Sequence, residues 1–267
     1  MNEPVLILSD LHLGLPASRI SAAEQLRPLI EGAGTVIFNG DTFQELAKAY
    51  RPHSEVLLED LKAICRELGA QPLFLPGNHD PGWGGPGWAE LAGGRIIVTH
   101  GDSVMWGGSP WSRESISRAD QVRELWAQNE RADYDPEERM ELANKMALLL
   151  RPATVPKGRS LFRRVADAVN PPRRAFEILR VWWEQAEKAA IFGKRYFPKS
   201  EVLILGHFHR RGVWTRSGRL IVNTGAFVNP NRANWVGFQD GWLTVGKVKE
   251  RNGKFFRGES DAVWRAE

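Results

Sequence analysis

The chain contains very little cysteine and no long apolar run. Only one of its 267 residues, Cys65, is a cysteine, so no intrachain disulfide can form and nothing argues for an oxidising compartment. No apolar run approaches the roughly 18 residues of a transmembrane helix. The N-terminus lacks the basic and apolar regions of a secretory signal. The sequence therefore predicts a soluble, cytoplasmic protein.

Histidine is scarce, and neither sign of charge dominates. There are 6 His, and 36 Lys and Arg against 32 Asp and Glu, for a net charge of +4. With 42% hydrophobic and 25% charged residues, the chain is not disordered, collagen-like, a disulfide scaffold or a pure coiled coil. The length suits one large domain, or one domain with a sizeable insertion. The small basic excess fits an anionic substrate without proving one.

Apolar runs and helical patterns alternate through the first part of the chain, and strand patterns follow one another at its end. Strands are predicted at residues 5–8, 35–38, 72–75, 95–99 and 201–205, and helices at 17–30 and 53–68. Beyond residue 205, further strands are predicted at 212–215, 220–223, 241–249 and 254–257. Alternation of strands and helices predicts a layered α/β domain.

Residues 106–199 interrupt this alternation. They show helical periodicity at 116–130, 136–150 and 175–191, broken by prolines. Residues 151–199 carry 12 Lys and Arg against 4 Asp and Glu, so this segment has a net charge of +8. We interpret residues 106–199 as a helical cap inserted into a catalytic domain formed by residues 1–105 and 200–267.

Five of the six histidines lie in short motifs at the predicted carboxyl ends of strands. The motifs are Asp10-Leu11-His12, Asn39-Gly40-Asp41, Gly77-Asn78-His79-Asp80, His100-Gly101-Asp102 and Gly206-His207-Phe208-His209. Open α/β sheets bind their ligands at these ends. Imidazole nitrogens and hard oxygens beside tight turns are typical of metal sites. Since side chains alternate along a strand, we expect Asp10 and His12 to point the same way, and likewise His207 and His209.

These motifs, in this order, resemble the calcineurin-like metallophosphoesterases, over residues 5 to about 230. The resemblance implies a layered α-β-β-α sandwich with the cap as an insertion. It also implies a two-metal centre that hydrolyses phosphoesters with a water ionised between two divalent ions. Mixed oxygen and nitrogen donors without sulfur suit Mn, with Fe or Zn as alternatives.

The resemblance also assigns roles to individual residues. Asp10, His12, Asp41 and His209 would hold one metal, and Asp41, Asn78, His100 and His207 the other, with Asp41 bridging. His79 would stabilise the transition state or protonate the leaving group, with Asp80 orienting it. Asn223, in a turn after a predicted strand, is a candidate contact to the phosphate.

The large helical insertion resembles the UDP-2,3-diacylglucosamine hydrolase branch, whose members cleave a pyrophosphate in a lipid A precursor. Such a nucleotide-lipid would be bound by basic residues of the cap: Arg163, Arg164, Arg173, Arg174 and Arg180. Nearby apolar residues would line an acyl groove, dip into a membrane interface, or only pack the cap onto the body: Leu161, Phe162, Phe176, Trp182 and Trp183.

Two other interpretations stay open. They stay open because the UDP-2,3-diacylglucosamine hydrolase branch usually has Arg where this chain has His79, and an acidic residue where this chain has Gln44. The motifs also resemble the nuclease branch, and a basic, Trp-rich cap fits a nucleic-acid backbone. That branch usually carries a further domain, and only about 58 residues follow the last motif. A catalytically silent scaffold that binds a partner protein through the cap is the third interpretation.

Overall fold

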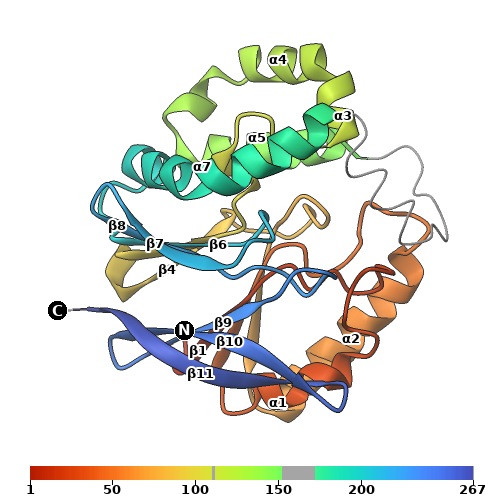
Figure 1. Cartoon of the computed structure of the whole chain (residues 1–267), viewed down its shortest axis with the longest axis vertical. Helices are drawn as coiled ribbons and strands as arrows, with labels where there is room; N and C mark the ends of the chain where they lie inside the picture. Colours follow the sequence, from red (N-terminus) through yellow and green to blue (C-terminus); the bar gives the residue numbers. More distant parts are fainter. Residues whose placement is uncertain (110–111, 152–171, 267) are drawn as a thin grey trace.

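The protein is described by a computed structural model over residues 1–109, 112–151 and 172–266. It consists of two β-sheets packed face to face, with helices on both outer faces (Figure 1). This is the predicted α-β-β-α sandwich. No helix of the described part of the chain is long and apolar enough to cross a bilayer.

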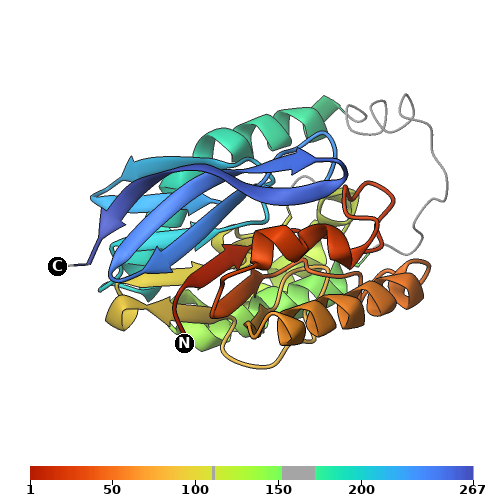
Figure 2. The ribbon, with the colours of Figure 1, turned by 90° about the horizontal axis from the view of Figure 1, so that it is seen from below.

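The first sheet has six strands in the order β11-β10-β9-β1-β2-β3. Its strands are β1 (Val5–Leu8), β2 (Thr35–Asn39), β3 (Gln71–Leu75), β9 (Asn234–Gln239), β10 (Trp242–Arg251) and β11 (Lys254–Arg265). β1, β2 and β3 run parallel, and β9, β10 and β11 continue the sheet antiparallel. Figure 2 shows the C-terminal strands lying beside the N-terminal part of the chain.

The second sheet has five strands in the order β4-β5-β6-β8-β7. They are β4 (Trp88–Leu91), β5 (Ile96–Thr99), β6 (Val202–Leu205), β7 (Gly212–Arg216) and β8 (Arg219–Asn223). β5, β6 and β8 run parallel. All nine strands expected from the apolar runs are present. The sequence pattern missed β4 and β9.

The described helical segments lie on the outer faces and in the connections. They are η1 (Ala23–Leu26), α1 (Arg27–Ile30), α2 (Arg51–Glu67), η2 (Ala92–Gly94), η3 (Asp102–Val104), α3 (Arg113–Ser117), α4 (Ala119–Ala127), η4 (Glu130–Asp133), α5 (Pro136–Leu149) and α7 (Pro172–Tyr196). Figure 1 shows α1 and α2 below the first sheet and α5 and α7 above the second.

The central strands are apolar throughout because both of their faces are buried. In β1, Val5 and Ile7 face the core between the sheets, whereas Leu6 and Leu8 face the core under α1 and α2. Each fully buried aliphatic side chain of this kind contributes about 1.5–3 kcal/mol of transfer free energy. A strand buried on both sides therefore reads as a continuous apolar run rather than an alternating one.

The expected helix over residues 17–30 is wrong in its first half. Only η1 and α1 form, and the chain before them consists of turns and bends held by contacts with a distant segment: Ser18 makes an isolated bridge to Val228, and the Arg19 N–H donates to the Phe227 carbonyl. Pairing with a distant segment satisfies these backbone groups. Tertiary contact thus overrides the local helical spacing.

The α7 helix is part of the layered body rather than a separate cap. Its Val181, Ala189 and Phe192 share one apolar core with Leu203 of β6 and Ile221 of β8. The described part of residues 106–199 contains α3, α4, η4, α5 and α7, and the last of these helices forms the outer layer over the second sheet.

Candidate metal centre

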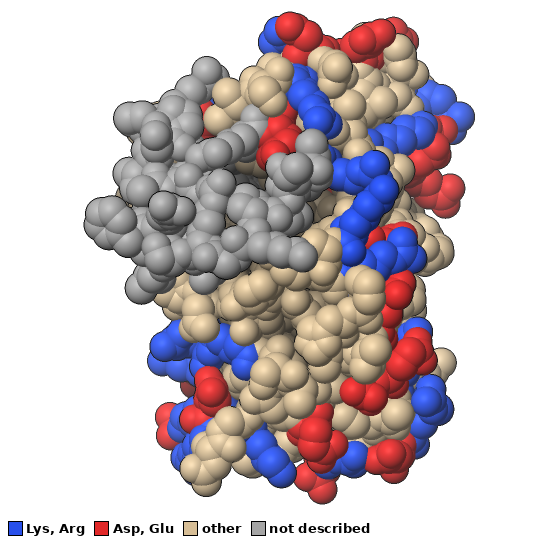
Figure 3. Space-filling view, turned by 90° about the vertical axis from the view of Figure 1, so that its right-hand side faces the viewer, with Lys and Arg blue, Asp and Glu red and all other residues tan. Residues whose placement is uncertain are grey.

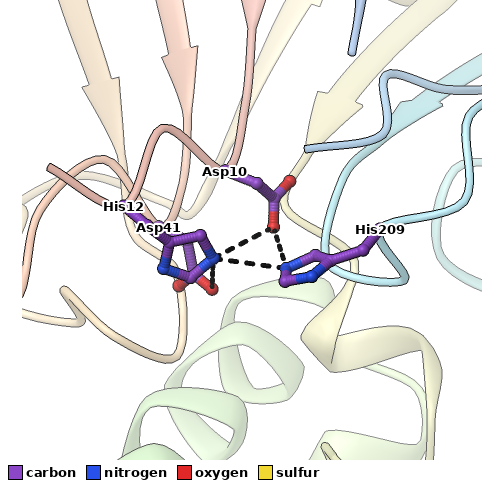
Figure 4. Close-up of side chains that lie close together, drawn as sticks. All are labelled: Asp10, His12, Asp41 and His209. Carbon is purple, nitrogen blue, oxygen red and sulfur yellow. Dashed lines mark hydrogen bonds and ion pairs between the residues drawn. The ribbon is translucent and has the colours of Figure 1, made fainter. Parts of the chain in front are cut away.

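Four predicted metal-ligating side chains converge where the two sheets meet (Figure 4). Asp10 and His12 follow β1, Asp41 follows β2, and His209 follows β6. β1 and β2 lie next to each other and run parallel, so their carboxyl ends share one edge of the first sheet. The loop after β6 reaches the same place from the second sheet.

The ligand atoms of these four residues lie within 4.8 Å of one another. His209 Nε2 lies 3.1 Å from Asp10 Oδ1 and 3.2 Å from His12 Nε2. His12 Nε2 in turn lies 3.6 Å from Asp41 Oδ2. Two imidazoles and two carboxylates around one point are a donor set that divalent transition metals accept. The residues therefore fit a metal ion of the expected kind.

A second group of predicted ligands lies on the other side of Asp41. His100 Nε2 lies 3.4 Å from Asp41 Oδ1 and 3.4 Å from Asn78 Oδ1. The ring of His207 packs against that of His100, with centroids 5.1 Å apart. The Asp41 carboxylate thus presents one oxygen to each group.

The backbone at Asp10, His12, His207 and His209 is left-handed, so strand alternation, on which the expected alignment of the paired side chains was based, does not apply to these four residues. β1 ends at Leu8, and Asp10 and His12 have φ values of 52° and 48°. His207 and His209, after β6, have φ values of 63° and 54°. Left-handed backbone costs about 1–2 kcal/mol at a residue other than glycine. Such strain is concentrated at functional sites, where the surrounding fold enforces it.

Burial and mutual charge set the protonation of this cluster. Burial lowers the pKa of His12 to about 3, and burial together with the charge of His100 lowers that of His207 to about 3. Burial acts to raise the pKa of Asp41, but the neighbouring His100 and His79 lower it well below its usual value. His12 and His207 are thus neutral and Asp41 is ionised, the forms in which these groups bind metals. Burial acts to lower the pKa of His100, but Asp41 raises it well above its usual value, so His100 must release its proton to bind a metal.

The family follows from a comparison that covers most of the chain. The family model for calcineurin-like phosphoesterases matches residues 3–211. The chain belongs to the calcineurin-like phosphoesterase family. The protein is thus a metal-dependent phosphoesterase, a hydrolase. A search of curated proteins finds no match to this chain.

Solved structures of low sequence identity are similar over nearly the whole chain. A single mutant of Vps29 from Entamoeba histolytica is 14% identical, with a TM-score of 0.46, covering 97% of this chain and 98% of that one. An uncharacterised predicted phosphoesterase from Streptococcus pneumoniae is 17% identical, with a TM-score of 0.40 and 99% of both chains covered. A cold-active protein-tyrosine phosphatase from a Shewanella species is 13% identical, with a TM-score of 0.42, covering 96% and 80%.

Asp80 has a different place from the one predicted. Its carboxylate does not contact the His79 side chain. It accepts hydrogen bonds from the N–H groups of Asp41, Thr42, Phe43 and Gly77, and from the Trp83 indole. Asp80 therefore holds the loop that carries Asp41, and its effect on His79 is indirect.

The side chain that holds His79 is Gln44, which stands where the hydrolase branch usually has an acidic residue. Gln44 Oε1 lies 2.9 Å from His79 Nδ1, and Gln44 Nε2 lies 3.1 Å from His12 Nδ1. His79 Nε2 lies 4.0 Å from Asp41 Oδ2, and the side chain is 37% exposed. His79 thus stands beside the cluster and open to a substrate. The signal for Gln44 was its position three residues after Asp41.

Asn223 does not fit its predicted contact to the substrate. The residue is fully buried. Its Nδ2 donates to the Gly206 carbonyl at 2.7 Å and to Gln185 Oε1 at 3.1 Å, and its Oδ1 accepts from the Gly225 N–H. With the whole amide engaged, Asn223 supports the turn that presents His207.

The predicted basic residues of the cap are only partly described. Arg163 and Arg164 lie outside the described residues, and Arg173 and Arg174 lie in α7 with side chains outside the described part. Arg180 is described and pairs with Glu177 at 2.7 Å.

The aromatic residues of α7 divide between packing and exposure. Trp182 donates its indole N–H to the Phe208 carbonyl at 2.9 Å, which ties α7 to the loop between His207 and His209. Trp183 is 84% exposed and Phe176 is 65% exposed. Trp182 therefore packs the helix onto the body, whereas the other two face outward. Leu161 and Phe162 lie outside the described residues.

A cavity of about 790 Å³ lies beside the helices. Its walls combine apolar side chains, including Trp106, Trp126 and Val181, with the cations Arg180 and Lys188. Residues 104–107, at the end of η3 and just after it, also line it, whereas none of the proposed metal ligands does.

Proposed function

We propose that the phosphoesterase uses two divalent metal ions held on either side of Asp41. Asp10, His12 and His209 would complete one site, and Asn78, His100 and His207 the other. The observation that carries this proposal is the place of Asp41: Oδ2 faces His12, at 3.6 Å, and Oδ1 faces His100, at 3.4 Å. A carboxylate can bridge two cations because it has two oxygens.

The donor set combines carboxylate, amide and imidazole groups without sulfur, which suits Mn, Fe or Zn; we propose Mn, with Fe or Zn as alternatives. When bound, the ions would polarise a phosphoryl oxygen and ionise a water at neutral pH. The chain contributes positioning. Asp80 holds the Asp41 loop, Asn223 holds the Gly206 turn, and the His79 N–H donates to Asp41 Oδ1 at 2.8 Å.

His79 is proposed to donate a hydrogen bond to the transition state or a proton to the leaving group. We expect His79→Ala to lower kcat by about 100-fold or more, the usual range for a general acid or base. Metal content, measured on the same samples, should stay at the wild-type value. His53→Ala, on the exposed face of α2, is the matched control and should behave as wild type. Loss of metal from His79→Ala would show that His79 is a ligand instead.

For the substrate, we propose a pyrophosphate or phosphodiester that carries apolar chains, such as an acylated nucleotide-sugar. The cavity offers apolar walls together with the cations Arg180 and Lys188 and the acids Glu177 and Glu184. Phe176, Leu179 and Trp183 add an exposed apolar stripe along α7, at 65%, 63% and 84% exposure. On the face shown in Figure 3, a band of Lys and Arg side chains crosses the helical layer, with Asp and Glu side chains beside it; the cations of this band could bind an anionic headgroup.

A comparison of substrates tests this proposal. Protein stripped with a chelator and reloaded with Mn²⁺ should hydrolyse an artificial phosphodiester, whereas the stripped protein should not. The reloaded protein should then cleave a detergent-solubilised acylated nucleotide-sugar at least about tenfold faster, in kcat/KM, than single-stranded DNA. The reverse ranking would favour a nuclease. Tight metal binding without turnover of any phosphoester would favour a scaffold.

A further inference from the structure

Gln44 connects a proposed metal ligand to the proposed acid. Its carboxamide lies between two imidazoles, 3.1 Å from His12 Nδ1 and 2.9 Å from His79 Nδ1. The two rings meet edge to face, with centroids 4.7 Å apart and an angle of 88° between their planes. One side chain therefore contacts the outward nitrogen of both rings.

Hydrogen bonds through Ser54 fix the position of Gln44. The Gln44 N–H donates to Ser54 Oγ at 2.8 Å, and the Ser54 hydroxyl donates to the Leu13 carbonyl at 2.6 Å. Ser54 lies on α2. Gln44 itself is 1% exposed, so water does not compete for its amide. The carboxamide is thus a rigid, dry connection between the two rings.

A carboxamide has one donating and one accepting end, so it imposes opposite states on the two Nδ1 atoms. The ring that faces the carbonyl oxygen must carry a proton on Nδ1. The ring that faces the NH₂ group must have a lone pair there. The two ends have the same shape, so the chemistry of the rings decides which end faces which ring.

His12 decides the orientation. Its Nε2 points into the cluster, 3.2 Å from His209 Nε2 and 3.6 Å from Asp41 Oδ2. A neutral imidazole that binds a metal through Nε2 must carry its proton on Nδ1. The structure places Gln44 Oε1 at His79 Nδ1 and Gln44 Nε2 at His12 Nδ1. Because the two ends of an amide are distinguished only by their hydrogen bonds, we turn the carboxamide by 180°. Its carbonyl oxygen then faces His12 Nδ1–H, and its NH₂ group donates to His79 Nδ1.

We propose that Gln44 is a positioning residue that sets opposite tautomers: Nδ1–H in His12, which frees Nε2 for a metal, and Nε2–H in His79, which presents a donor to the substrate. This inference rests on the proposed metal site. A carboxylate at position 44 would accept from both rings and place the His79 proton on Nδ1. Glutamine in place of an acid thus has a chemical consequence for the neighbouring histidine.

Long-range ¹H–¹⁵N spectra of the full-length, Zn²⁺-loaded protein test the assignment, with His79 signals identified by their loss in His79→Asn. We expect a lone-pair Nδ1 and a protonated Nε2 in wild-type His79. Gln44→Glu should move the proton to Nδ1 and lower kcat without weakening Zn²⁺ binding. Gln44→Met leaves His12 without its acceptor and should weaken Zn²⁺ binding by about 10-fold or more.

Gln25→Glu, which adds the same charge in η1, is the control and should change neither spectrum nor affinity. A protonated Nδ1 in wild-type His79 would overturn the proposal, even if no variant folds. So would a His79 tautomer that is the same in Gln44→Glu and wild type. Neither readout depends on turnover: a metal-loaded protein inactive on every phosphoester would refute the proposed function while the tautomers are still measured.

Discussion

Asp41→Asn should reduce phosphodiesterase activity with Mn²⁺ by well over 100-fold, because losses of 10- to 100-fold follow even when only an outer partner of a metal ligand is removed. The substitution keeps the shape but removes the negative charge that faces both histidine groups, at 3.6 Å from His12 and 3.4 Å from His100. Bound metal should fall with the activity. Both are measured on the same preparation, by hydrolysis of an artificial phosphodiester and by elemental analysis.

The matched control is Asp60→Asn, the same change at an exposed position of α2. It should keep wild-type activity and metal content. Because Asp41 is buried among ionisable groups, circular dichroism must show that the variant is folded. A folded Asp41→Asn protein as active as wild type would remove the two-metal proposal altogether.

Gly40→Ala should damage both stability and metal binding. Gly40 has φ of 74°, and a Cβ there would lie 2.5 Å from His100 Nδ1. Left-handed strain costs about 1–3 kcal/mol and overpacking about another 1–3. The urea midpoint should therefore fall markedly, and the displaced His100 ring should weaken Zn²⁺ binding by about 10-fold or more.

Gly69→Ala separates strain from crowding. Gly69 follows the end of α2 with φ of 69°, yet a Cβ there would meet nothing within 4 Å. We expect only the backbone cost of about 1–2 kcal/mol and unchanged Zn²⁺ affinity. If both variants lose the same stability and bind Zn²⁺ equally, the close approach of Gly40 to His100 has no energetic importance.

The sequence pattern predicted the layers well because the strands are short and buried on both faces. Short apolar runs bounded by turn residues, such as residues 5–8 and 201–205, favour strands between two cores, and both form strands. β9 escaped detection because Gly237 interrupts its apolar pattern. The helical pattern at residues 17–30 was misleading because Ser18 and Arg19 pair with Val228 and Phe227. A contact between segments so far apart in the chain does not appear in the local sequence.

The proposed ligands were recognisable because each lies in a motif at a strand end. The residues that hold these ligands in place were not recognisable from the sequence. Asp80 was expected to orient His79, and Asn223 to contact the phosphate, yet both make hydrogen bonds with the backbone of neighbouring loops. Gln44 is nearly invisible in sequence, because its importance lies in two rings, one 32 and one 35 residues away along the chain.

The sequence alone thus determined the family and the two-layered sheet core, and it indicated the side chains that we propose as metal ligands, since these depend on short motifs and on local apolar patterns. Only the tertiary structure decided that Asp41 faces two separate donor groups, that left-handed turns aim the ligands, that α7 is a layer of the body, and that Gln44 joins two histidines. The physical reason is that these features arise from contacts between residues remote in the chain. Their energies depend on distance in space, which no local pattern encodes.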